Sequence, residues 1–72
     1  MNLLDKVNRV YGKELNDYCE RFPTLGNMLI DALSSTKYIG ELTISRAIDF
    51  SVAINRSIGD SIAELYRLST ED

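Results

Sequence analysis

Few side chains in this sequence are suited to catalysis. The single cysteine, Cys19, has no histidine to activate its thiol, and without histidine the commonest zinc ligand is also missing. Asp60 and Glu64 would share one face of a helix, where two carboxylates can divide acid and base roles, but neighbouring charges indicate a solvated strip there. The sequence has no glycine-rich phosphate loop and no cluster of metal ligands. We therefore expect a protein that is not an enzyme and needs no metal or cofactor.

The stretch "SSTK", residues 34–37, is a first candidate for binding an anion. Ser35 or Thr36 would cap a third helix there, so that free backbone N–H groups, hydroxyls and the Lys37 ammonium would converge on a phosphate. The alternative is a plain helix cap with an exposed lysine.

The tyrosines give a second candidate for ligand binding. Tyr11 is close to Lys13, and Tyr38 is next to Lys37, and such pairs suit a nucleobase stacked on the ring with its phosphate at the cation. The alternative is core packing, which the spacing of apolar residues favours for Tyr11 and Tyr18.

The composition narrows the possible partners. The net charge is −3 and the pI about 4.8, so the chain lacks the basic face of a phosphate-backbone binder, and we expect no binding to DNA or RNA. We find no apolar run of about 18 residues and no signal-peptide core, so we expect no membrane segment and a cytoplasmic protein. A free thiol agrees with a reducing compartment.

Helical spacing of apolar residues runs through the chain, and we expect one all-α domain over residues 1–72. Asn2 is the expected N-cap of a first helix that Pro23 ends, because proline disfavours helical geometry in the residue before it. A second helix is expected over residues 24–33.

The third helix is expected to begin at Thr36, or alternatively near Leu42 or Thr43 after Gly40, and to continue to residue 68. The predicted architecture is a two- or three-helix hairpin or bundle with a long C-terminal helix.

Projected as one continuous helix, residues 41–68 are apolar or small around most of the circumference. The band expected to face the first two helices comprises Ile44, Ala47, Ile48, Ser51, Ile58, Ile62, Leu65 and Tyr66. One shoulder beside it comprises Phe50, Ile54, Ser57, Ser61 and Leu68, and the shoulder on the other side comprises Ser45, Val52, Arg56, Gly59 and Ala63. The charged strip comprises Arg46, Asp49, Asp60, Glu64 and Arg67. A surface helix usually buries a stripe little more than about 100° wide. The surplus apolar surface therefore indicates a second contact, and we expect a homo-oligomer.

The segment "LTISRAIDFSVAINRSI", residues 42–58, resembles the second helix of the phage anti-CBASS cyclic-nucleotide sponges, a family of small helical-hairpin proteins. The family pattern is a hydrophobe, Ser/Thr, Lys/Arg, an acidic position, a small or Met-rich turn and a closing small–Ile pair. The matching residues are Ile44, Ser45, Arg46, Asp49, Ser51, Val52, Asn55, Ser57 and Ile58.

This resemblance implies a compact multimer that binds cyclic oligonucleotides between subunits without hydrolysing them. Ser45 matches the hydroxyl that contacts phosphate in the family. Where the family has a basic residue nine positions earlier, this chain has Thr36, so Lys37 or Arg46 would have to supply that contact. Family members also hold a base between a tyrosine and a lysine of the N-terminal half. Tyr11 and Lys13 are the nearest candidates for that pair.

Two functions follow as hypotheses. The first is a sponge that sequesters cyclic di- or trinucleotide immune signals between subunits, in the host cytoplasm if the chain is phage-encoded. The alternative is a small acidic helical module for protein–protein interaction, or an inhibitor of a host or defence enzyme, that docks its surplus apolar surface on another protein.

Overall fold

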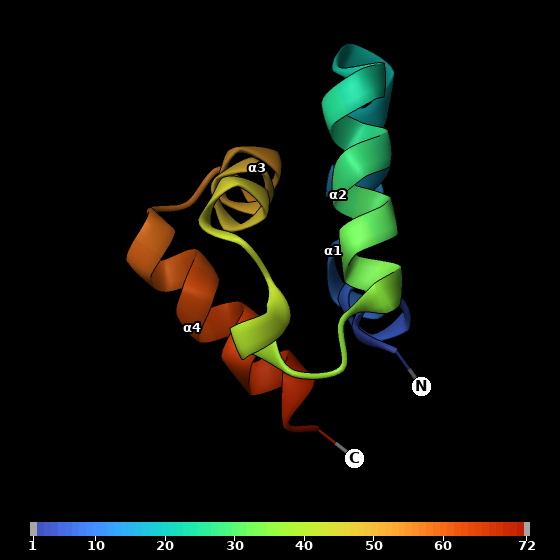
Figure 1. Ribbon diagram of the computed structural model, residues 1–72. Coiled ribbons are helices and arrows are strands. Elements are labelled where there is room, and N and C mark those ends of the chain that lie inside the picture. The colour runs from blue at the N-terminus through green and yellow to red at the C-terminus, as the bar shows by residue number, and fades with distance from the viewer. Residues whose placement is uncertain (1, 72) are drawn as a thin grey trace.

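The computed structural model describes residues 2–71, which form four α-helices and one short 3-10 turn (Figure 1). The helices are α1 (Leu3–Arg21), α2 (Pro23–Ser35), α3 (Ile44–Ile54) and α4 (Ile58–Ser69), and the 3-10 turn η1 (Ile39–Glu41) precedes α3. α1 and α2 run antiparallel and side by side, and α3 and α4 form a second pair packed against them. The all-α prediction is confirmed.

The first helix begins and ends where the sequence predicts. The Asn2 Oδ1 atom accepts a hydrogen bond from the Asp5 N–H at 3.0 Å, and Asp5 lies in the first turn, where the helix dipole favours a carboxylate. Pro23 keeps Phe22 out of helical geometry (φ −134°, ψ 76°), so α1 stops at Arg21. Pro23 then occupies the first turn of α2, where an N–H would have no partner within the helix.

α1 and α2 approach each other closely at Gly26. A Cβ atom on this residue would lie 2.7 Å from both the Cα and the Sγ of Cys19, closer than atoms can pack. Only glycine therefore fits at this position in the helix pair as it stands.

The predicted long C-terminal helix is wrong, because the chain turns between α3 and α4. Asn55 adopts the left-handed conformation (φ 57°, ψ 50°), which asparagine tolerates better than most residues. The Arg56 N–H donates to the Ser51 carbonyl at 3.1 Å, which closes the end of α3 in a Schellman motif. The Ser57 Oγ accepts a hydrogen bond from the Asp60 N–H at 3.1 Å and so caps the start of α4.

The predicted start of the third helix at Thr36 is also wrong, and the alternative near Thr43 is correct. Thr36 has an extended backbone (φ −93°, ψ 125°) at the C-terminal end of α2. The Thr43 Oγ1 accepts a hydrogen bond from the Arg46 N–H at 3.3 Å and caps α3.

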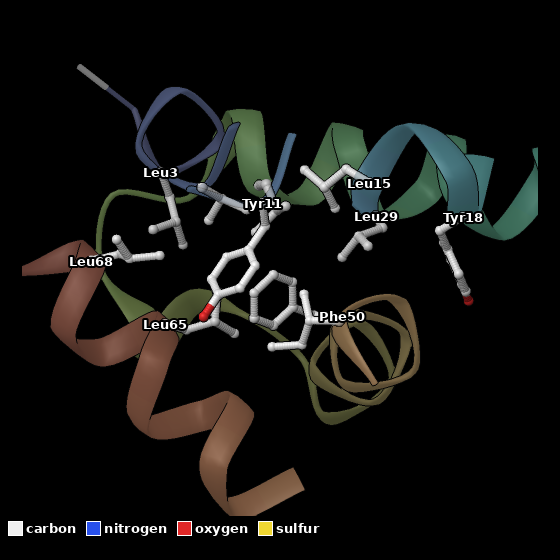
Figure 2. Close-up of a cluster of buried hydrophobic side chains, with 11 residues drawn as sticks. Leu3, Tyr11, Leu15, Tyr18, Leu29, Phe50, Leu65 and Leu68 are labelled. Atoms are coloured by element: carbon white, nitrogen blue, oxygen red, sulfur yellow. The ribbon is translucent and has the colours of Figure 1, made fainter. Parts of the chain in front are cut away.

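The hydrophobic core lies where the four helices meet (Figure 2). Its buried members are Leu3, Val7, Tyr11, Leu15, Tyr18, Leu29, Leu33, Phe50, Ile54, Leu65 and Leu68. The rings of Tyr11 and Phe50 pack edge to face, with centroids 5.9 Å apart and planes 85° apart, a favourable geometry for two aromatic quadrupoles. Tyr11 also departs from helical geometry (φ −121°, ψ 24°), so α1 kinks where it meets α3 and α4.

The turn at Asn55 changes which residues face the core. Phe50, Ile54, Ser61 and Leu68, which the single-helix projection puts on a shoulder, are buried. Ile44, Ile48, Ile58, Ile62 and Tyr66, which it puts in the contact band, are between 37% and 70% exposed. The projection fails because it carries one angular phase through residues 55–57, where the chain is not helical.

The Gly26→Ala substitution is expected to lower the free energy of unfolding by about 1–3 kcal/mol, because the new methyl group would force α1 and α2 apart at Cys19. Urea denaturation followed by circular dichroism measures the change. Gly12→Ala is the control: its Cβ would meet only the Asn8 Oδ1, at 3.9 Å, so we expect stabilisation by about 0.4–1 kcal/mol. Equal effects of the two variants would contradict the close contact.

Candidate functional site

Thr36, expected at a phosphate site, lies at the C-terminal end of α2. Its side chain is buried, with the residue 4% exposed, and its Oγ1 donates to the Ala32 carbonyl at 2.6 Å. The helix end beside it presents carbonyl groups and the negative pole of the helix dipole, which disfavour an anion. The free N–H groups expected at "SSTK" are therefore absent.

Lys37 and Tyr38 are exposed, and they lie together beside a cavity. The cavity has a volume of about 390 Å³ and is lined by Asn2, Ser34, Ser35, Lys37 and Tyr38. The Tyr38 ring is 74% exposed, so an aromatic face and an ammonium group border one hollow.

The Glu41 carboxylate already occupies the backbone donors at this turn. One of its oxygens accepts hydrogen bonds from the N–H groups of Tyr38 at 2.8 Å and Lys37 at 2.9 Å. These two bonds, that of Tyr38 first, hold the pKa of Glu41 below its ordinary value. An anionic ligand would therefore have to rely on the Lys37 side chain and the hydroxyls, because Glu41 competes for the amides.

Ser45 and Arg46 lie in the first turn of α3 but have different surroundings. Ser45 is exposed. The Arg46 Nε lies 3.3 Å from the Asp49 Oδ2, and the two side chains are only 15% and 11% exposed. Tyr18 donates its hydroxyl to the Asp49 Oδ1 at 3.3 Å, so this ion pair, expected on a solvated strip, is instead enclosed against α1. The Nη1 of Arg46 is buried and finds no hydrogen-bond partner within residues 2–71.

Tyr11 and Lys13, expected to hold a base, lie apart on different faces of α1. Tyr11 is 7% exposed, packs on Phe50 and donates its hydroxyl to the Glu64 Oε1 at 2.9 Å. Burial first, and then this hydrogen bond, raise the pKa of Tyr11. Lys13 is exposed and lies 3.4 Å from the Asp17 carboxylate. The structure therefore shows Tyr11 in the core, which was the alternative interpretation of the sequence.

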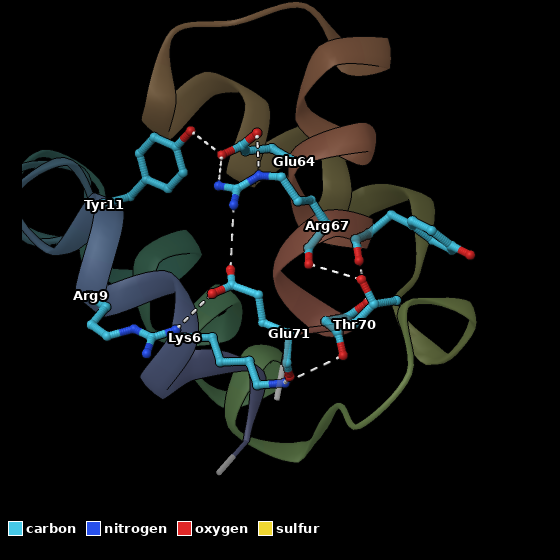
Figure 3. Close-up of polar contacts among 9 residues, drawn as sticks. Lys6, Arg9, Tyr11, Glu64, Arg67, Thr70 and Glu71 are labelled. Atoms are coloured by element: carbon cyan, nitrogen blue, oxygen red, sulfur yellow. Dashed lines mark hydrogen bonds and ion pairs between the residues drawn. The ribbon is translucent and has the colours of Figure 1, made fainter.

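A polar network joins the C-terminal end of α4 to α1 (Figure 3). The Glu71 carboxylate lies 3.2 Å from Arg9 and 3.4 Å from Arg67, and the Lys6 ammonium donates to the Glu71 carbonyl at 2.5 Å. Arg67 also binds Glu64 at 2.6 Å. The contacts of Lys6 and Arg9 with Glu71 join residues more than fifty positions apart, so no local sequence pattern reveals them. Only the pairs of Arg67 with Glu64 and Glu71 are local.

α3 and α4 carry a large exposed apolar surface that the sequence did not predict. We call it the α3–α4 face. Its members and their exposed fractions are Ile44 (70%), Ile48 (40%), Val52 (55%), Ile58 (46%), Ile62 (37%) and Tyr66 (60%). On each helix they recur every fourth residue, so each helix presents one ridge of large side chains.

One member of each ridge borders a shared cavity. This cavity, of about 190 Å³, is lined by Ile39, Leu42, Ile44, Ala47, Ile62 and Leu65. The exposed residues next to the ridges include the small Ser45, Gly59 and Ala63 and also the charged Arg56, Asp60 and Arg67. The surface is therefore apolar, with charged residues at its edge.

The size of the α3–α4 face is unusual for a short chain. The exposed parts of its six side chains amount to roughly 500 Å², near the upper end of the largest apolar patch on a typical monomer (about 300–600 Å²). The local signal for it was present in the sequence: Asn55 suits a helix end, and Ser57 stands three residues before Asp60, as an N-cap does.

Other kinds of site are not found in the part of the chain that the structure describes. Residues 2–71 bring together no group of three or more His, Cys, Asp or Glu side chains that could hold a metal ion. No helix among them is long and apolar enough to cross a membrane. No family model matches the chain, and no curated protein or solved structure is significantly similar to it.

The free energy of unfolding is expected to fall as the pH drops below about 5. Folding lowers the pKa of Glu64, through its bond to Arg67 first and to Tyr11 second, so the unfolded chain binds that proton more readily than the folded chain. The stabilisation is complete above the ordinary glutamate pKa of about 4.3 and is lost as the pH falls through the lowered value.

Urea denaturation at a series of pH values measures this effect, and Glu64→Gln should flatten the dependence. Glu20→Gln, which removes an exposed carboxylate of α1, is the matched control and should keep the wild-type slope. A Glu64→Gln curve that parallels the wild type would show that this network does not carry the acid sensitivity.

Proposed function

We propose that this chain is a small, non-catalytic binding module that docks another polypeptide through the α3–α4 face. The observation that carries the proposal is the set of six large apolar side chains, 37–70% exposed, on the two neighbouring helices α3 and α4. Burying such a surface is favourable by roughly 25 cal/mol per Å². Leaving it in water has no structural benefit for the chain itself, since the core is formed without it.

The geometry also fits a known mode of recognition. A groove between two helices, bordered by ridges of residues four apart, accepts the apolar ridge of another helix. The absence of charge from the α3–α4 face favours an apolar partner over an ionic one. This proposal corresponds to the interaction-module alternative among the sequence hypotheses.

The proposal predicts position-specific crosslinking. A photoreactive phenylalanine in place of Ile48, at the centre of the α3 ridge, should give covalent protein adducts in the native cell. The same group in place of the exposed Asn16, on α1, should not, although it is equally accessible. Adducts from both positions in equal amount, or from neither, would contradict a specific docking surface; gel analysis of the adducts is the measurement.

A second candidate function is the sequestration of cyclic oligonucleotides at the end of α2. The observation that favours it is the cavity of about 390 Å³ at which Lys37 and the exposed Tyr38 ring lie with the hydroxyls of Ser34 and Ser35. A base could stack on the ring while the ammonium meets a phosphate. Thr36, Tyr11 and the buried Arg46 guanidinium would take no direct part in such a site, because they are enclosed in the fold.

This second candidate predicts calorimetric binding, with micromolar affinity or tighter, to at least one member of a panel of cyclic di- and trinucleotides. Lys37→Ala should weaken it at least tenfold, because the phosphate loses a charge-assisted hydrogen bond. Lys13→Ala, which removes an exposed lysine of α1, should leave the affinity unchanged. Absence of heat with every nucleotide would rule the function out.

A further inference from the structure

The α3–α4 face can be assigned an occupant from its own geometry. Each copy of the chain carries two ridges of exposed apolar residues four apart, and a cavity that one member of each ridge, Ile44 and Ile62, helps to line. We infer that a second copy of this chain covers the face, in a two-fold arrangement that places the ridges of one copy in the groove of the other. This inference rests on the proposed binding function and names its partner.

The area of the face agrees with a dimer of modest affinity. Two copies would bury roughly 1,000 Å² of apolar side chain between them, and the polar rim adds to this. Stable protein interfaces bury about 1,200–2,000 Å² in total. A single helix from another protein would cover less of the two ridges than a second helix pair does, and it would leave part of them in water.

Charge also permits self-association at this face. The chain has a net charge of −3, so two copies repel each other when charged surfaces meet. The α3–α4 face has no charged member, and charges farther than about 8–10 Å apart are largely screened at physiological ionic strength. By contrast, the exposed surface of α1 carries charges along its length.

Gly59 would let the backbone of another helix approach closely here. It lies in the first turn of α4, next to the ridge, and a Cβ atom on it would have no neighbour within 4 Å. Its φ is not positive, so neither packing nor backbone geometry within the chain requires glycine. Glycine in a helix reduces stability relative to alanine, and its advantage is that another backbone can approach closely. Gly26, in contrast, has that reason inside the chain.

The effect of Gly59 on self-association can be separated from its effect on the stability of the monomer. Sedimentation equilibrium of the wild type should show self-association from 8.1 kDa to twice that mass as the concentration rises. Gly59→Ala should weaken the association at least tenfold, while the dilute monomer unfolds at a higher urea concentration than the wild type. Gly12→Ala should stabilise the monomer without changing the association, because it lies on α1. Ile48→Glu should leave only monomer.

A wild-type mass that stays at 8.1 kDa at millimolar concentration would overturn the second copy as occupant. Association that Gly59→Ala leaves unchanged would overturn it as well. The crosslinking experiment then distinguishes the two proposals. Adducts of other masses from position 48, together with a monomeric chain, remove the second copy and keep the docking surface. A monomeric chain without adducts removes both.

Discussion

The left-handed residue Asn55 determines how the second half of this molecule is built. Because the chain leaves helical geometry there, α4 can turn back against α1 instead of continuing in line with α3. That return brings Leu65 and Leu68 into the core and places Glu64 beside Tyr11. The same turn brings Ile44 of α3 and Ile62 of α4 to one cavity on the outside. The core, the polar network and the exposed face all depend on one backbone conformation.

The parts of the fold that could be predicted from the sequence are those with a local cause. The Asn2 cap and the break at Pro23 each follow from the chemistry of one side chain and its nearest neighbours, and the structure confirms both. Asn55 is also a local signal for a turn, but the apolar pattern over residues 41–68 favoured one continuous helix. If that turn is missed, every later residue is assigned to the wrong side of the helix. Tyr66 was expected to face the first two helices and Ser61 to lie on a shoulder, whereas Tyr66 is exposed and Ser61 is buried.

The candidate sites show a different limit. Tyr11, Arg46 and Thr36 are residue types suited to a nucleotide, yet the fold uses all three internally, for core packing, for a buried ion pair and for the end of a helix. Residue type and spacing do not reveal whether a polar group already has a partner within the chain. Lys37 and Ser45 remain accessible because they lie outside the helix contacts. The sequence carries a signal for the turn that forms the α3–α4 face, but the exposure of its side chains is a property of the packed molecule.

The hydrogen bond from the Lys6 ammonium to the Glu71 carbonyl ties the first turns of α1 to the segment after α4. α1 begins and α4 ends on the same side of the molecule (Figure 1). The large exposed side chains of α3 and α4 are not members of the buried core, so sequence changes at them would leave the core contacts in place.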